Sequence, residues 1–435
     1  MQEPSTTTAT PDVVPTNRVR VRWMFIALLV IGGVVNYLDR STLSIGNTTI
    51  AKELHFNTIE MGLLLSAFSW PYAIANLPAG FLVDKFGAKK MFAIAATAWS
   101  VVAVLTSFAR SFPFFYAARV ALGVSESPFF TSGLKVSERW FRKDERSLPL
   151  SVINTGSQIA NAIAPPLLTF LLLTMSWRGM FVIIGTFGFI VVAVWIKLYR
   201  DPTREEEIAI KGLELEAAAA KAEKPASWGS LLKLPNTWAM VVGAFGIFYT
   251  VWVYLTWLPS YLETSRGFSL AATGWIAGLP FLCGIIGVLT GGVVSAAAIR
   301  RGVPTIRARK IPIVGGALLA AAAVLPVAYV DNTFLNIALL CVGYFASQVP
   351  IGVIWTLASD IAEPAQVSSL GSIQNFGGFL GAALAPAVTG YILSATDGNY
   401  SLVFGVGGIL LVVGALSYGL FVKDRRPAAV LTAEA

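Results

Sequence analysis

The chain has 435 residues, of which 55% are hydrophobic and only 13% are charged, and its formal net charge is +8. About a quarter of the residues of a soluble domain are charged, so this composition excludes an ordinary soluble protein and indicates that lipid surrounds most of the chain. The single histidine and the two cysteines, Cys283 and Cys341, argue against a histidine metal site, a disulfide framework or a metal cluster.

A membrane-spanning helix needs about 20 mostly apolar residues, and on that basis the sequence predicts two blocks of spans. The first block lies approximately at 24–47, 60–82, 91–109, 112–134, 147–172 and 177–199. The second block lies approximately at 237–262, 271–297, 312–330, 333–359, 366–394 and 400–422. We therefore expect an all-α membrane protein whose twelve transmembrane helices form two pseudo-symmetric six-helix bundles.

Polar segments separate and flank these two blocks. The expected bundles cover residues 23–199 and 237–422, and a linker rich in Glu, Ala and Lys joins them over 200–236. The N-terminal tail covers 1–22, and the C-terminal tail covers 423–435.

Lysine and arginine residues lie mostly on one side of the predicted spans. Of the 32, 26 lie in the tails, the linker and the connections on the same side, whereas the opposite connections hold only four. Because positive residues concentrate on the cytoplasmic side, we expect both termini in the cytoplasm and the protein in the inner membrane. A distribution by membrane side rather than on one patch also argues against nucleic-acid binding.

Four charged residues lie inside predicted spans: Asp39 and Arg40 in the first, and Arg119 and Glu126 in the fourth. A charge at this depth costs about 3 kcal/mol on insertion scales, so such residues usually face a wet cavity and mark a substrate or ion path. A structural ion pair is the alternative, but four charges exceed what one pair needs. Residues seven apart share one helix face about 10.5 Å apart, so Arg119 and Glu126 each need a partner from another helix. Asp39 and Arg40 are the natural candidates.

The connection between the second and third spans has the pattern Gly80-x-x-x-Asp84-x-x-Gly87-x-Lys-Lys. Glycines here allow close helix approach and a tight turn, and Asp84 can accept hydrogen bonds from a helix N-terminus or a basic group. An ordinary positively charged loop is the alternative interpretation. The corresponding stretch of the second half, 292–301, lacks the aspartate. We expect Gly80, Asp84 and Gly87 to form a cytoplasmic gate.

This loop resembles the signature of the major facilitator superfamily. The first and fourth spans resemble one branch of it, the anion:cation symporters or phthalate permease family, which includes hexuronate, aldonate, glucarate and phthalate permeases. The resemblance is carried by Asn36 to Arg40, Arg119 to Pro128, Trp140-Phe141, Glu145-Arg146, Asn154 to Ser157, Ala164 to Pro166, Gln374 to Gly377 and Pro386. It implies the major facilitator fold, a transporter rather than an enzyme, and no cofactor besides the coupled proton. A monomer suffices for this architecture.

The resemblance also implies roles for individual residues. Asp39 and Glu126 match acids that carry protons, and Arg40 matches the arginine that holds the substrate carboxylate. Arg119 matches the arginine that pairs with the first-span acid. Further matches to cavity-lining positions, each explained equally well by an interhelical hydrogen bond, are Tyr37, Tyr72, Gln158, Trp355 and Asn375. The chemistry of these side chains is consistent with the implied roles. A carboxyl group buried in the membrane resists ionisation, whereas arginine stays charged and binds carboxylates bidentately.

Two stretches depart from the sugar-acid carriers of this family. Those carriers usually show Pro and Asn where this chain has Phe130 and nearby small residues, and Asn and Thr where it has Phe379 and Ala385. Buried hydroxyls need hydrogen-bond partners, whereas a flat apolar acid prefers aromatic surfaces. The changes favour an aromatic acid, although Phe129, Phe130 and Phe379 could equally face lipid or pack between helices.

We therefore expect a proton-coupled symporter that imports a small organic carboxylate by alternating access, with a slight preference for a phthalate-like acid. One alternative is a sugar-acid proton symporter, and another is an organic-anion exchanger or efflux carrier that uses the same residues. A polytopic membrane enzyme is the remaining alternative, which the lack of a nucleophile–base pair or metal-ligand cluster argues against. The expected partners are the organic anion, protons and the lipid bilayer.

Overall fold

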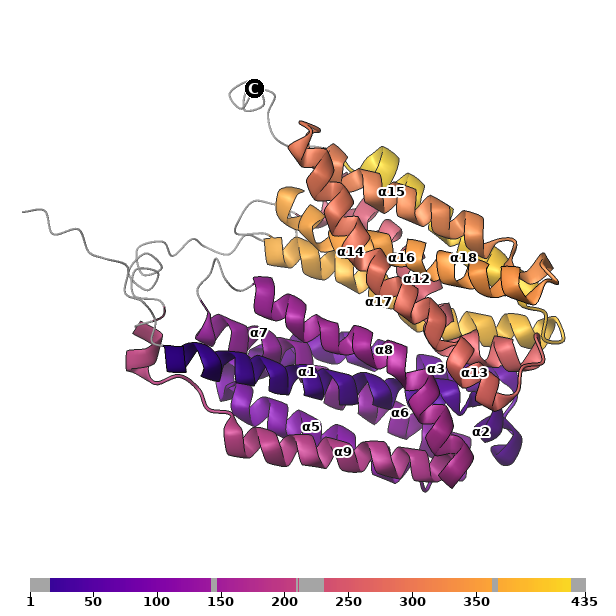
Figure 1. Cartoon of the computed structure of the whole chain (residues 1–435), viewed down its shortest axis with the longest axis horizontal. Coiled ribbons are helices and arrows are strands. Elements are labelled where there is room, and N and C mark those ends of the chain that lie inside the picture. Colours follow the sequence, from indigo (N-terminus) through magenta and orange to yellow (C-terminus); the bar gives the residue numbers. More distant parts are fainter. Residues whose placement is uncertain (1–15, 142–146, 209, 211–230, 362–366, 424–435) are drawn as a thin grey trace, which may run out of the picture.

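The computed structural model describes residues 16–141, 147–208, 210, 231–361 and 367–423, and all its regular elements over these ranges are helical. Ten of the described helices are long and apolar enough to cross a membrane. Two further crossings are broken in the middle, so neither of their parts meets that standard alone. Figure 1 shows the helices running side by side in two groups. Over the described residues, the ten long helices and the two divided crossings make up the predicted twelve.

The first group contains α1 (Thr16–Ile45), α2 (Asn47–Leu54), α3 (Thr58–Ser66), α4 (Ser69–Phe86), α5 (Ala88–Thr106), α6 (Phe112–Glu126), α7 (Pro128–Trp140), α8 (Ser147–Met175) and α9 (Trp177–Leu198). The second group contains α12 (Pro235–Thr264), α13 (Leu270–Ile276), α14 (Gly278–Arg300), α15 (Thr305–Val324), η1 (Val327–Tyr329), α16 (Thr333–Ile361), α17 (Val367–Ala395), α18 (Tyr400–Leu416) and η3 (Ser417–Phe421). We call these groups the first half and the second half. The exact bounds predicted for the bundles, linker and tails stay a prediction.

Two crossings are divided by short non-helical breaks, one of which is followed directly by a proline. The fourth crossing breaks at Ser127, where Pro128 begins α7 at a position that needs no backbone donor. The second crossing breaks at Ala67 and Phe68, between α3 and α4. Its first part starts with a reciprocal capping box between Asn57 and Glu60. Both breaks lie beside the charged residues of the first half, as described below.

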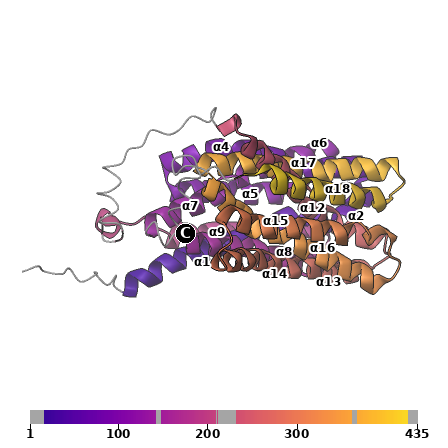
Figure 2. The same cartoon turned by 90° about the horizontal axis from the view of Figure 1, so that it is seen from above.

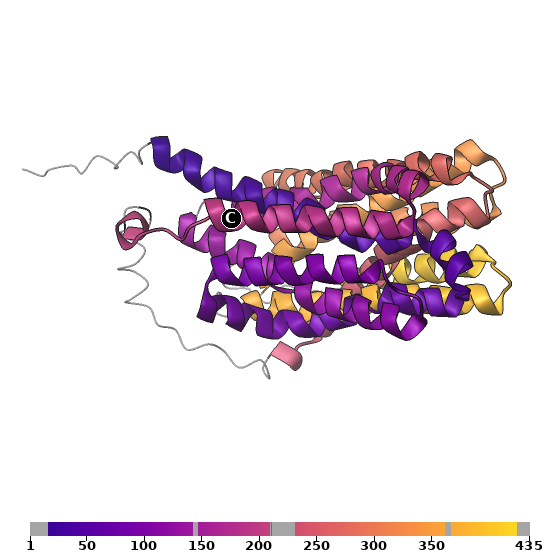
Figure 3. The ribbon, with the colours of Figure 1, turned by 90° about the horizontal axis from the view of Figure 1, so that it is seen from below.

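The chain direction defines two ends of the molecule. We call the end where α1 and α12 begin the linker end, and the opposite end, where α2 and α13 lie, the far end. In Figure 2 the labels of α2 and α13 lie toward the end opposite to the start of α1. Figure 3 shows the first-half helices, coloured indigo to magenta, in front of the second half. Positions along each helix are described below by these two ends.

The two halves pack most closely at the far end, through backbone rather than long side chains. A Cβ atom added to Gly62 of α3 would lie 2.7 Å from the carbonyl oxygen of Pro386 on α17. One added to Gly390 would lie 2.4 Å from the carbonyl oxygen of Thr58. No side chain fits at either position, so glycine permits the close approach of α3 to α17.

Hydrogen bonds between the halves lie in the same region. Ser66 Oγ donates to the carbonyl oxygen of Ala383 at 2.5 Å, and Ser44 Oγ donates to that of Leu255 at 2.8 Å. At the tip, Thr48 Oγ1 donates to Glu263 Oε2 at 2.5 Å. One apolar cluster also draws buried residues from both halves. The far end is therefore closed in this conformation.

Candidate functional site

The four charged residues of the first and fourth spans lie together in the interior of the first half. Asp39, Arg119 and Glu126 are at most 3% exposed, and the Arg40 side chain is 12% exposed. Arg40 Nε donates to Glu126 Oε2 at 2.7 Å. Glu126 therefore finds its partner on α1, as the spacing on the fourth span required. The four groups are close enough to influence one another electrostatically.

Helix geometry explains why the fourth-span charges point inward. The buried face of α6 carries Phe115, Arg119, Leu122, Gly123 and Glu126, which recur at the spacing of one helical stripe. Gly123 also permits a very close approach, because a Cβ atom there would lie 2.3 Å from the carbonyl oxygen of Phe68. The break between α3 and α4 is thereby held against α6. This contact brings the Phe68 ring to the charged cluster.

Aromatic rings surround the Arg40 guanidinium. Its Cζ atom lies 4.5 Å from the ring centre of Tyr37, 4.6 Å from that of Phe68 and 4.8 Å from that of Tyr72. A desolvated cation–π contact stabilises a cation by about 2 kcal/mol or more. The three rings therefore replace part of the hydration that Arg40 loses inside the membrane. They also leave its polar edge to a carboxylate, here that of Glu126.

The remaining charges do not form the pair that the resemblance implied. Both carboxylate oxygens of Asp39, and Nε and one terminal nitrogen of Arg119, are buried without a hydrogen-bond partner. The second carboxylate oxygen of Glu126 and both side-chain polar atoms of Asn36 are also buried without one. Asp39 and Arg119 influence each other through space but are not hydrogen-bonded. Such a concentration of unused hydrogen-bonding capacity is typical of a functional site.

A small cavity of about 40 Å³ lies beside Arg40, between the two halves. Its first-half lining consists of Tyr37, Arg40, Ser41, Leu65, Phe68, Ser69, Arg119 and Asn161. Its second-half lining consists of Trp252, Leu255 and Thr256, all from α12. A water molecule needs about 10–15 Å³ measured in this way, so the cavity has room for only a few waters. A substrate would enter only after the walls move apart.

The predicted lining residues divide into two groups. Tyr37 lines the cavity, and Tyr72 reaches Arg40 through its ring. Gln158 and Asn375 are partly buried and do not line it, although Asn375 Oδ1 is buried without a hydrogen-bond partner. Trp355 is 45% exposed and lies outside this cavity. In the conformation described, only the first two therefore belong to the site around Arg40.

Sequence reasoning missed several lining residues. Asn161 could have been found, because it lies three residues after Gln158 on the same helix and is a buried amide within an apolar run. The sequence gives no sign that the apolar lining residues Phe68, Trp252 and Leu255 belong to the cavity, because apolar residues are expected everywhere on membrane-spanning helices. Thr256 left none either, since its hydroxyl donates to the carbonyl oxygen of Trp252 as in many buried helices.

The two phenylalanines of the fourth crossing do not form an aromatic substrate wall. Phe129 is 1% exposed, and its ring packs against Phe92 at 6.0 Å and Trp99 at 6.3 Å. Phe130 stacks edgewise on Phe129 at 5.0 Å and packs against the same core. Of the rings that suggested an aromatic acid, only Phe379 reaches the region of Arg40, where it contacts Tyr72 at 5.3 Å.

The loop predicted as a gate shows one expected feature and lacks another. Gly87 adopts φ +82°, the left-handed region that favours glycine, and so makes the tight turn between α4 and α5. Gly80 permits no close approach, because an added Cβ atom would meet nothing within 4 Å. Gly80 lies toward the linker end of α4. The side chain of Asp84 lies outside the described residues.

The second half has its own ion pair near the linker end. The loop sequence at 292–301, which lacks the aspartate, did not predict it. Arg309 Nε donates to Asp360 Oδ2 at 2.8 Å, and a terminal nitrogen of Arg309 donates to Ser295 Oγ at 3.2 Å. The three residues join α14, α15 and α16.

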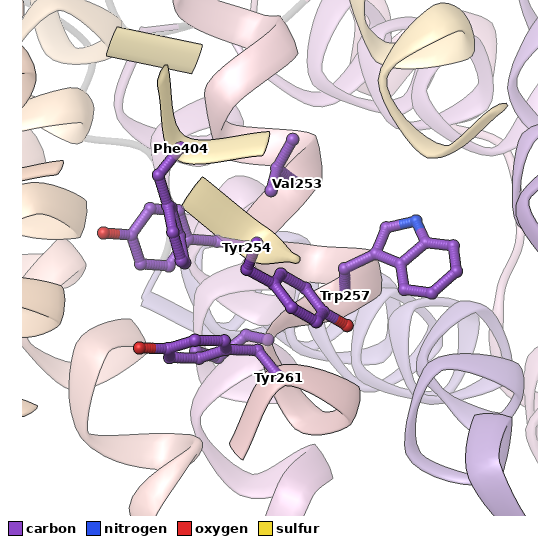
Figure 4. Close-up of a pocket in the computed structure, with 7 residues that line it drawn as sticks. Val253, Tyr254, Trp257, Tyr261 and Phe404 are labelled. Atoms are coloured by element: carbon purple, nitrogen blue, oxygen red, sulfur yellow. The ribbon is translucent and has the colours of Figure 1, made fainter. Parts of the chain in front are cut away.

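A second cavity, of about 10 Å³, lies within the second half and is shown in Figure 4. Aromatic side chains of α12 and α18, including Tyr254, Trp257, Tyr261 and Phe404, make up most of its lining. It is too small to hold a water molecule comfortably and offers no charged group. We interpret it as a packing defect between bulky rings.

Comparisons with known proteins agree with this architecture. The family model described as Major Facilitator Superfamily matches residues 29–386. The chain is 36% identical to the probable L-galactonate transporter of Escherichia coli (strain K12), over 93% of this chain and 90% of the relative. It is 33% identical to the probable galactarate/D-glucarate transporter GarP of the same strain, over 89% of this chain and 91% of the relative.

A solved structure shows the same fold at low identity. A bacterial homolog to the human lysosomal transporter Spinster, in an inward-facing and unoccupied conformation, superimposes with a TM-score of 0.76 at 16% identity. The match covers 94% of this chain and 99% of that one. The family and these relatives are transporters, which removes the membrane-enzyme alternative. The chain is a multi-pass membrane transporter and belongs to the Major Facilitator Superfamily.

Proposed function

We propose that this protein imports a small sugar acid together with protons across the inner membrane by alternating access. The observation that carries the proposal is the ion pair between Arg40 and Glu126, buried in the membrane interior beside a cavity between the two halves. The linker end, which carries most of the lysines and arginines, then faces the cytoplasm.

Competition for Arg40 supplies a coupling mechanism. A substrate carboxylate needs the guanidinium edge that Glu126 occupies in this conformation. A proton on Glu126 removes the competing negative charge and frees Arg40 for the substrate. Leaving Arg40 unpaired in a low-dielectric site is costly, so either a charged Glu126 or a bound anion should accompany it at all times. Proton and anion are therefore favoured together.

Asp39 and Arg119 extend this mechanism. Asp39 is a second carboxyl group buried in the same cluster, and neither of its oxygens has a hydrogen-bond partner. With Asp39 and Glu126 both able to carry protons, uptake of a monoanion would move net positive charge inward. Each such charge contributes about 2.3 kcal/mol per 100 mV of membrane potential. Arg119 offers unused donors to the same cluster.

The preferred substrate class changes from the aromatic acid that the sequence favoured to the sugar-acid alternative. The similar proteins are named for galactonate, galactarate and glucarate. Phe129 and Phe130, which had suggested an aromatic site, pack inside the first half. Ser41, Asn161 and Thr256 line the cavity and offer polar groups to substrate hydroxyls.

Uptake into proteoliposomes tests the proposal. We expect L-galactonate or D-glucarate to accumulate when an inward proton gradient is imposed, and phthalate not to accumulate. Glu126→Gln should retain binding and exchange but lose gradient-driven accumulation, because the amide cannot carry the proton. Accumulation that survives collapse of the gradient would exclude symport. Substrate-dependent exchange without any response to the gradient would support the exchanger alternative instead.

A further inference from the structure

A chain of aromatic rings connects the two halves beside Arg40. The ring of Phe379, on α17 of the second half, lies 5.3 Å from that of Tyr72, on α4 of the first half. The same ring lies 5.9 Å from Trp252 and 6.5 Å from Phe248, both on α12. Tyr72 in turn stacks on Phe68 at 5.5 Å and lies over the Arg40 guanidinium. Phe379 thus joins the charged site to the opposite half.

Chain direction places these rings on the linker side of the cavity. The helix α4 runs toward the linker end, so Tyr72 lies beyond Phe68 and Ser69 in that direction. The helix α12 runs away from the linker end, so Trp252 and Phe248 precede the cavity residues Leu255 and Thr256. A molecule that leaves the cavity toward the linker end therefore meets the rings first.

The two sides of the cavity are closed in physically different ways. Toward the far end, backbone atoms of α3 and α17 touch at Gly62 and Gly390, so opening there requires whole helices to separate. Toward the linker end, the contact between the halves is made by the side chains of Tyr72 and Phe379. Phe379 is only partly buried, and a phenylalanine side chain can move between staggered rotamers, whereas a backbone contact cannot be released in this way. A rotation of this side chain would therefore remove the ring contact between the halves on this side, before or together with a movement of the walls.

We infer that Phe379 is the gate residue on the linker side of the site, a role whose purpose, and the membrane side used in its test, rest on the proposed function. In the conformation described, its ring contacts Tyr72 of the first half and the cavity residue Trp252, so it lies just outside the Arg40 cavity rather than in its lining. Rotation of the ring away from Tyr72 opens a path for the acid to leave. Glycine contacts close the far side during that step.

Cysteine labelling from the linker side tests the gate without any substrate. Ser41→Cys, made in a Cys283→Ser/Cys341→Ser background, places a reactive thiol on the cavity wall. A membrane-impermeant maleimide is applied to inside-out vesicles. With Phe379 present, labelling should be slow. Phe379→Ala should raise the labelling rate on the order of tenfold, because an aromatic pair contributes about 0.5–1.5 kcal/mol to the closed arrangement.

Two further variants separate gating from general loosening. Phe379→Tyr keeps the ring and should label as slowly as the parent. Phe376→Ala removes a ring that is 58% exposed on the same helix, and should also leave the rate unchanged. Phe379→Leu provides a second test if the alanine variant does not fold. Unchanged labelling in Phe379→Ala and Phe379→Leu, or equally fast labelling in Phe376→Ala, would overturn the inference. Failure of sugar-acid uptake in the parent would overturn only the proposed function.

Discussion

The two halves share one fold but carry different chemistry. The first half holds Asp39, Arg40, Arg119 and Glu126 in its interior, with several polar atoms that have no partner. The second half meets them with Trp252, Leu255 and Thr256, and its described ion pair between Arg309 and Asp360 lies at the ends of its helices. The comparison teaches that the charged groups at the cavity come from one half, while the other half faces them there with apolar and hydroxyl side chains.

Among the changes considered, removal of the Arg40 side chain should have the largest effect on acid binding. We expect Arg40→Ala to weaken acid binding on the order of 30-fold or more, since loss of one partner of a buried charge contact costs about 2–5 kcal/mol. Binding is measured by the rise in thermal stability with added L-galactonate. Arg40→Ala also leaves Glu126 unpaired, so the double variant with Glu126→Gln should recover stability but not binding. Recovery of binding in that double variant would contradict the role of Arg40.

Backbone contact between the halves should be the next most sensitive feature. Gly390→Ala places a Cβ atom 2.4 Å from the carbonyl oxygen of Thr58 and should force α17 away from α3. We expect slower uptake and a far end that is open more often. Accessibility of an introduced Ser44→Cys to an impermeant reagent applied from outside reports this opening.

The same helix offers a matched control for this glycine. Gly371 has nothing within 4 Å of an added Cβ atom. Gly371→Ala should therefore keep normal uptake and accessibility, and gain up to about 1 kcal/mol of helix stability. Equal effects of the two substitutions would show that the contact at Gly390 does not hold the far end closed.

The second-half ion pair should affect stability more than transport. Arg309→Gln leaves Asp360 without its partner at a half-buried site, at a cost of about 1–3 kcal/mol. The melting temperature should fall by a few degrees, whereas the apparent affinity for the acid should stay unchanged. Arg300→Gln, at an exposed position near the same end, should change neither property. A large loss of affinity in Arg309→Gln would mean that charge in the second half also serves binding.

The smallest effect is expected outside the membrane, at the linker end of the first half. The Arg200 guanidinium donates twice to Glu206, at 2.6 and 2.8 Å, and these bonds lower the pKa of Glu206 to about 2. The stabilisation is present above the ordinary pKa of glutamate and disappears as the pH falls through about 2. Exposed pairs contribute at most about 1 kcal/mol, so Glu206→Gln should barely change melting at pH 7. A large change there would contradict this contrast with the buried pair.

Most of the fold follows from the sequence, because lipid imposes a simple rule on apolar segments. Twelve crossings and the position of the embedded charges could be read from segment length and charge alone. The breaks at Phe68 and Ser127 could not, because an apolar run looks continuous whether or not its helix is bent. The first-half site was also readable, since charges in membrane spans are rare and their helical spacing limits their partners.

The second-half side of the site was much harder to predict. Trp252 and Phe379 face the cavity region, whereas Trp355 and Phe376 are exposed, and nothing in the sequence separates these aromatic residues. Whether an aromatic side chain points toward the cavity or outward depends on the rotation of its helix about the helix axis, and tertiary packing sets that rotation. The pairing of Glu126 with Arg40, and the absence of a hydrogen bond between Arg119 and Asp39, depend on the same detail.

The carboxylate of Glu126 has one more consequence, because it occupies the place that cargo would take. After release of the substrate, the empty transporter must change conformation so that the site opens to the other side again. An unpaired guanidinium buried in the membrane would make that change costly. With the Glu126 carboxylate paired to Arg40, the empty protein supplies its own anion to the guanidinium and can change conformation without bound substrate. Under the proposed mechanism, this ion pair therefore allows net transport rather than only the exchange of one anion for another.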